Sequence, residues 1–182
     1  MTITHSQLLA HWGPRRLIYF PLDRFLEHIR VGPEAFPPEG ALPLEVPILF
    51  TVAVDVPDVE LFSLLRVQVG VAQPILLIVI GCVPDEPSML YCLNPATGSI
   101  VLFDTNPDHP GWELVNTSFA AFVEFLYRFD ELIQSDPGGA ERVELGRELR
   151  QKLVEVDPLA FEDPESWWNV AFQQLLASAP PA

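Results

Sequence analysis

Residues 75–80, with the sequence Ile-Leu-Leu-Ile-Val-Ile, constrain the fold more than any other segment, because every residue in the run is apolar. A strand with one face in water alternates apolar and polar residues, whereas an unbroken aliphatic run of this length is typical of a strand that is covered on both faces. The run is also far too short to cross a bilayer. We therefore expect a central strand in a protein that has no membrane span.

Four further segments have the composition of strands. Residues 48–54 and 61–69 precede the apolar run, and residues 89–93 and 99–103 follow it. All are rich in β-branched or other apolar residues. The last two flank Asn-Pro-Ala-Thr-Gly at residues 94–98, a set of residues that favours a tight reversal, so we expect a β-hairpin there.

Helical spacing follows the strands. Phe119, Phe122, Val123 and Leu126 recur at intervals of three and four, and Asn116 is placed to cap that helix. A more exposed helix is expected over residues 141–156.

A last helix is expected after Asp163, the capping residue, with Pro164 at its first position and an apolar face that includes Trp167 and Trp168. Those tryptophans are interpreted as core residues, the alternative being a ligand platform.

The first thirty residues or so suggest two short helical pieces, and the proline-rich residues 31–47 suggest an ordered surface loop anchored by Phe36, Leu42 and Leu44. The order of helices, then strands, then helices is typical of α+β proteins. We predict a single domain over residues 1–182, built on a central, mostly antiparallel sheet with helices packed against it.

The charge is strongly acidic. The chain has 25 Asp and Glu against 10 Lys and Arg, a formal net charge of −15. Such a field repels phosphate backbones and anionic lipids and attracts cationic partners, so we expect no nucleic-acid binding and no membrane binding. The alternative is that the acidity serves only solubility.

The sequence offers no recognisable catalytic or metal-binding constellation. Cys82 and Cys92 lie in apolar strands without a Cys-x-x-Cys motif, so both are interpreted as buried thiols. The oxygen-rich segment from Asp104 to Asp108 has the start of a calcium loop, but His109 stands where such a loop needs glycine, and we interpret it as a turn. The four histidines are scattered. We expect no catalytic residue, no metal and no cofactor.

The first residues lack the basic start and apolar stretch of a signal peptide. The sequence therefore predicts a cytoplasmic location.

Short motifs spread over residues 8–177 resemble the SUKH superfamily of immunity proteins, especially its fourth group. They are Leu-Asp-Arg-Phe-Leu at 22–26, Val-Gly-Pro at 31–33, Ile-Val-Ile-Gly at 78–81, the hairpin at 90–101, Val-Asn-Thr-Ser-Phe at 115–119, and an ending with Asp163-Pro164 and Trp167-Trp168. The leucine usual between the glycine and the proline is missing at Gly32-Pro33.

The resemblance implies a non-catalytic SUKH-like α+β domain that neutralises a cognate bacterial polymorphic toxin. Many toxins that such families counter are nucleases or nucleic-acid deaminases, whose cationic clefts an acidic protein could block. The partner is therefore expected to be a basic toxin domain, and the chain itself a monomer or weak dimer. Acidic residues in or beside loops are the candidate contacts: Asp55, Asp58, Glu60, Asp85, Glu86, Asp104 and Asp108.

Two other functions remain open at this point. One is a cytoplasmic regulatory or scaffolding module of the same fold with a host partner. The other is a small hydrolase or ligand-binding enzyme, which a deep polar pocket with converging titratable groups would indicate.

Overall fold

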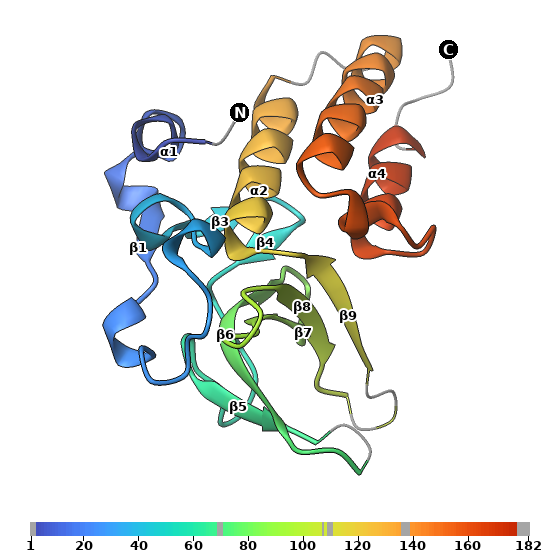
Figure 1. Ribbon diagram of the computed structural model, residues 1–182. Coiled ribbons are helices and arrows are strands. Elements are labelled where there is room, and N and C mark those ends of the chain that lie inside the picture. Colours follow the sequence, from blue (N-terminus) through green and yellow to red (C-terminus); the bar gives the residue numbers. More distant parts are fainter. Residues whose placement is uncertain (1–2, 69–70, 107, 109–110, 136–138, 178–182) are drawn as a thin grey trace.

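The computed structural model describes residues 3–68, 71–106, 108, 111–135 and 139–177. It confirms the α+β class, with helices gathered on one side of a strongly twisted sheet (Figure 1). The helices are α1 (His5–Trp12), α2 (Phe119–Gln134), α3 (Gly139–Val156) and α4 (Trp167–Ala177). The strands are β1 (Leu17–Tyr19), β2 (Ala41–Pro43), β3 (Glu45–Val46), β4 (Phe50–Thr51), β5 (Leu64–Val67), β6 (Ile75–Val83), β7 (Glu86–Leu93), β8 (Ile100–Asp104) and β9 (Gly111–Asn116).

Strand β6 contains the apolar run and lies inside the main sheet, as predicted. The strands are ordered β3-β4-β6-β7-β8-β9, all neighbours are antiparallel, and β5 pairs with the first part of β6. Side chains of β6 alternate between two apolar clusters. Ile78 and Ile80 join the main core beneath the helices, whereas Leu77 and Val79 join a smaller cluster on the other face of the sheet. Because both faces of β6 are covered, the strand tolerates no polar residue in this stretch.

The predicted hairpin is also confirmed. Leu93 of β7 pairs with Ile100 of β8, and Gly98 in the turn has a φ of +76°, which favours glycine. The segment predicted as a strand at 48–54 is shorter than expected, because only Phe50 and Thr51 form β4. The segment at 61–69 is likewise reduced to β5 within the described residues.

Two helix starts differ from the prediction. Ser118, not Asn116, caps α2, and its Oγ accepts a hydrogen bond from Ala121 N at 3.0 Å. Helix α4 begins at Trp167 and not at Pro164, because residues 163–166 form a turn in which Asp163 Oδ1 accepts from Glu165 N at 2.9 Å. Asn116 and Asp163 are both suited to capping, but Asn116 bonds Asp157 and Asp163 stabilises the turn before α4.

Asn116 ends the unpredicted strand β9 and is fully buried in a polar network. Asp157, which is also buried, accepts hydrogen bonds from Asn116 Nδ2 at 3.0 Å, from Thr117 N at 2.8 Å and from Thr117 Oγ1 at 3.1 Å. Trp168 Nε1 donates to Asn116 Oδ1 at 3.0 Å. The network joins the end of the sheet to the segment after α3 and to α4.

The N-terminal region is more extended than predicted. Among the described residues there, α1 is the α-helix, the predicted second helical piece is a 3-10 turn, Leu22–Arg24, and Pro14–Arg16 forms another 3-10 turn. The proline-rich segment contains β2, which pairs with β1, and Leu42 within it is fully buried. Helix α1 is held to α2 by Asp130, whose Oδ2 lies 2.8 Å from His11 Nε2 and 2.7 Å from Trp12 Nε1.

Gly81 marks a very close approach between β6 and β4. A Cβ at this position would collide with the Phe50 ring and lie 2.7 Å from Thr51 O. The absence of a side chain therefore lets the short β3–β4 hairpin pack directly on the central strand.

Candidate functional site

The seven predicted contact residues lie at the surface, and all except the half-buried Asp104 are exposed. The structure divides them into two groups. One is at the end of the sheet where β6 turns into β7 and β8 leads towards β9. The other is in the segment between β4 and β5.

The sheet-end group contains Asp85, Glu86, Asp104 and Asp108. Glu86 pairs with Val83 across the β6–β7 turn, and Asp85 occupies that turn with a φ of 65°. Asp104 ends β8 opposite Met89 of β7, so it lies at the same end of the sheet. Asp104 Oδ1 accepts from Asn106 N at 2.9 Å, and Asn106 Oδ1 accepts from Asp108 N at 3.1 Å. Both contacts are typical of the turn predicted here, of which residues 107 and 109 lie outside the described residues.

The second group contains Asp55, Asp58 and Glu60. Valines of the same segment pack on the helix-free face of the sheet: Val54, Val56 and Val59. Burial raises the pKa of the Cys82 thiol below this segment, and the nearby charge of Asp55 raises it further. This group thus lies over the face opposite the helices and is separate from the sheet-end group.

Two acidic residues that the sequence analysis did not select join the sheet-end group. Glu113 of β9 lines a shallow hollow together with Asp104 and Met89. Glu113 is exposed, but the atoms around the hollow partly desolvate its carboxylate and raise its pKa. The backbone N–H of Trp167 lowers this pKa, and the charge of Asp163 raises it. Glu113 was missed because β9 was missed, and Asp163 because it was assigned only to capping.

An apolar groove adjoins these carboxylates. It has a volume of about 360 Å³ and lies between α2, α4, the β3–β4 turn and the β6–β7 turn. Its lining includes Ile48, Phe129, Trp167, Val170 and Glu86. The indole N–H of Trp167 is buried near the Tyr91 hydroxyl but meets no acceptor at hydrogen-bonding geometry.

Basic residues are missing from the strands and turns that build this region and from α4 itself. Arg128 lies on α2, where it pairs with Glu124 and Glu131, and Arg150 of α3 donates to Asn169 of α4 at 2.8 Å. The sequence has no lysine or arginine between Arg66 and Arg128, and none after Lys152. In the part of the chain that the structure describes, the ion pairs involve none of Asp85, Glu86, Asp104, Glu113 and Asp163. These five carboxylates therefore have no ion-pair partner among the described residues.

A second apolar surface lies on the helix-free face of the sheet. Trp112 and Leu114 of β9 are 43% and 39% exposed, and they lie opposite Phe103 and Val101 of β8. Together with polar residues of the β7–β8 turn, they line a shallow depression. No charged side chain lines this depression among the described residues.

A family model described as "SUKH-4 immunity protein" matches residues 3–174. The chain belongs to the SUKH-4 immunity protein family. Searches among curated proteins and among solved structures give no match. SUKH-4 membership confirms the resemblance found in the sequence, supports an immunity function and implies a cognate toxin as partner. Immunity proteins of this kind are generally non-enzymatic.

The two cysteine thiols of this SUKH-4 chain are buried. Cys82 and Cys92 are buried and unpaired, as predicted, and burial raises the pKa of Cys92 to about 12, which leaves its thiol protonated and weakly nucleophilic. Within the described ranges, no cluster of three or more His, Cys, Asp or Glu side chains could hold a metal ion. Nor does any helix in those ranges have the length and hydropathy needed to cross a bilayer. Trp168 is fully buried in the core, as predicted. Trp167 is only partly buried, packs against the core and lines the groove.

Proposed function

We propose that this SUKH-4 chain binds a cognate polymorphic toxin, a nuclease or nucleic-acid deaminase, and neutralises it by covering the cationic cleft that holds the toxin's substrate. The observation that supports the proposal is the sheet-end group of carboxylates, now with Glu113 and Asp163, which forms no ion pair in the described part of the chain. A cleft that binds a phosphate backbone is lined with lysine and arginine side chains, and an acidic surface is electrostatically complementary to such a cleft.

Electrostatic complementarity also suits the biological task. A toxin must be intercepted before it reaches nucleic acid, and opposite fields raise association rates strongly at low ionic strength. The net charge of −15 attracts a cationic toxin towards the whole molecule. The sheet-end group would define where the toxin's cleft docks.

The direct test is coexpression in bacteria with each toxin domain encoded beside this gene. We expect growth to be rescued with one such domain, and we expect the purified protein to inhibit that domain's action on nucleic acid in competition with the substrate. A catalytically inactive toxin domain controls for effects of expression alone. If no neighbouring toxin is neutralised while a host protein is bound, the chain is instead a regulatory or scaffolding module.

The sheet-end group has its own test. Replacing Asp85, Glu86, Asp104 and Asp108 with lysine should weaken binding of the neutralised toxin by more than tenfold, since each reversal turns attraction into repulsion. Replacing Asp55, Asp58 and Glu60 with lysine provides the comparison on the opposite face. Unchanged affinity in both variants would remove the electrostatic part of the proposal.

A further inference from the structure

We infer that the apolar groove between α2 and α4 is the anchoring pocket for one segment of the toxin, and that this segment carries a bulky apolar side chain flanked by lysine or arginine. The inference rests on the proposed function and adds to it the place of docking and the chemistry of the docked segment. It combines three observations: an apolar floor, an acidic rim and an exposed side chain held at the mouth in an unfavourable backbone conformation.

The floor of the groove is apolar and well packed. Phe129 of α2 is buried beneath it and lies 5.2 Å from the Trp168 ring, measured between ring centroids. Trp167 forms part of the wall, with its ring centroid 6.0 Å from that of Tyr91. A volume of about 360 Å³ falls in the range of roughly 300–1,000 Å³ that is usual for ligand pockets. Rigid apolar pockets of this kind receive the few side chains that dominate binding energy in protein interfaces.

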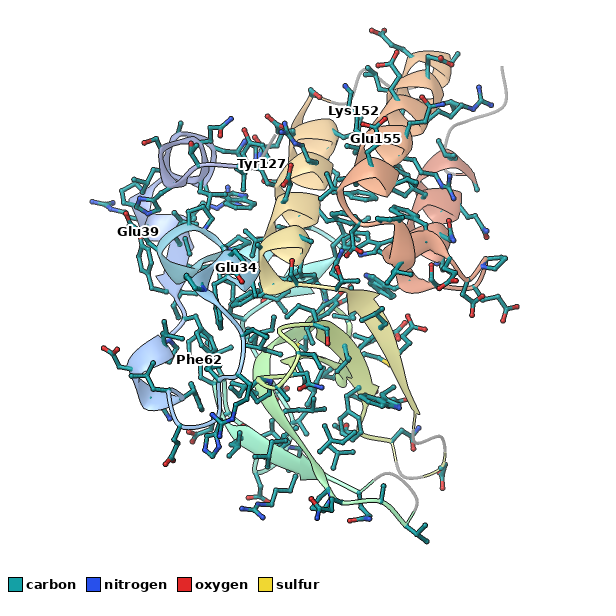
Figure 2. All side chains as sticks on the ribbon, viewed as in Figure 1. Glu34, Glu39, Phe62, Tyr127, Lys152 and Glu155 are labelled. Carbon is teal, nitrogen blue, oxygen red and sulfur yellow. The ribbon has the colours of Figure 1, made fainter. Side chains whose placement is uncertain are left out.

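The rim of the groove is acidic. Glu86 lines the groove itself, and Asp85 is its neighbour in the β6–β7 turn. Glu113 and Asp163 do not line the groove, but Glu113 lies near the backbone N–H of Trp167, a groove residue, and near Asp163. None of the described residues that line the groove is lysine or arginine. Basic residues occur elsewhere, for example Lys152 on α3 beside Glu155 (Figure 2).

Ile48 is the unusual residue at the mouth. It is 70% exposed, and its φ is 62°, in the left-handed region that a β-branched residue adopts at a cost of about 1–2 kcal/mol. Asparagine or glycine would suit that conformation better and would not expose an apolar side chain. A residue that is unfavourable for both the backbone and the surface, at the edge of an apolar groove, indicates a contact that forms only when the partner is bound.

The charge pattern decides between possible occupants. A second copy of this chain would bring another acidic rim against the first, and the two would repel. An acidic or purely apolar segment would leave Glu86 in the groove and the neighbouring Asp85 facing no opposite charge. A segment with an apolar side chain between cationic ones satisfies both the floor and the rim.

The first experiment uses Ile48→Asn and the toxin domain that the wild-type protein neutralises. We expect the dissociation constant to rise about tenfold or more, while the melting temperature stays equal to or above that of the wild type. Leu26→Asn is the matched control, since Leu26 is 59% exposed and does not line the groove. Equal affinity of Ile48→Asn and wild type would overturn the inference.

The second experiment identifies the docked segment. A photo-crosslinking amino acid at position 48, in the full chain with the same toxin domain, should yield a toxin peptide with an aromatic or long aliphatic residue next to lysine or arginine. An acidic peptide, or no crosslink despite tight binding, would contradict the inference while the proposed function stands. If the wild-type protein neutralises no toxin, the proposed function fails and the inference falls with it.

Discussion

Asp157 shows how much of the structure a single buried carboxylate can organise. It accepts hydrogen bonds from the Asn116 side chain and from Thr117, and Asn116 in turn holds the indole of Trp168. Removing the carboxylate would leave these buried donors without an acceptor. We expect Asp157→Ala to lower the free energy of unfolding by about 3 kcal/mol, measured by urea denaturation.

The exposed Glu155, two residues earlier in the chain, gives the control. Glu155→Ala should change the free energy of unfolding by no more than about 0.5 kcal/mol. Similar losses for both variants would show that the network around Asp157 is not what stabilises this region.

The raised pKa of Glu113 predicts how the stability of the protein depends on pH. Glu113 is exposed, but neighbouring atoms partly desolvate its carboxylate and raise its pKa in the folded protein, so the folded state binds the proton more tightly than the unfolded state does. Stability therefore falls as pH rises from the unfolded-state pKa through the raised pKa. We expect Glu113→Gln to raise the melting temperature at pH 7 and to have no such advantage below pH ~4, where wild-type Glu113 is protonated in both states.

Glu165→Gln removes one carboxylate from an exposed site and so controls for the lower net charge. An equal gain in that variant would mean that general repulsion, and not the local desolvation of the Glu113 carboxylate, explains the effect.

At the scale of elements, α1 depends on a few polar contacts with α2. Trp12 Nε1 donates to Asp130 Oδ2 at 2.7 Å in a buried setting. Trp12→Phe keeps an aromatic ring and removes this donor, so we expect a loss of about 1–3 kcal/mol in unfolding free energy and faster hydrogen exchange in α1.

Tyr19→Phe is the corresponding control, because it removes only an exposed contact between the Tyr19 hydroxyl and His5 Nε2 at 3.2 Å. We expect that variant to exchange like the wild type. Uniformly faster exchange across all helices in Trp12→Phe would show a global effect and would contradict a local role for the contact.

The elements that sequence reasoning could predict are those with a strong and uninterrupted pattern. Strand β6 has no polar residue from Ile75 to Ile80, and α2 repeats its phenylalanines at helical spacing. Strand β9 was not predicted, because its apolar residues do not alternate cleanly and its exposed Trp112 and Leu114 lie on a partly uncovered face. Strands β1 and β2 were missed because each has only three residues and their pairing depends on tertiary contacts.

The candidate site was predictable only in part for the same reason. Loop carboxylates such as Asp85 and Glu86 are visible in the sequence as acidic residues in a turn. Their association with Glu113 and Asp163 depends on β9 and on the start of α4, both of which the sequence pattern placed incorrectly or not at all. The groove joins four elements from distant parts of the chain, and no local pattern could indicate it.

At the scale of the whole molecule, the excess of acidic residues acts against the folded state. With 25 Asp and Glu against 10 Lys and Arg, the carboxylates repel one another in the compact chain more than in the unfolded one. Salt screens this repulsion over about 10 Å at 0.1 M. We expect the melting temperature to rise between 10 mM and 500 mM sodium chloride, measured by circular dichroism at pH 7.

The affinity for the toxin should fall over the same range of salt, since salt weakens attraction between unlike charges and slows association. Measuring both in the same buffers separates intramolecular from intermolecular electrostatics. A melting temperature that falls with salt would mean that favourable ion pairs outweigh repulsion within the chain.

The contact between Gly81 and Phe50 connects the interior of the sheet with the hairpin residue Ile48, which lines the groove. Phe50 follows Ile48 by two residues on the same short hairpin, so the missing side chain at position 81 lets the hairpin that carries Ile48 lie close against the sheet. Enlarging that glycine would push the hairpin outward and widen the mouth of the groove. Toxin selectivity could therefore change through a substitution that never touches a toxin.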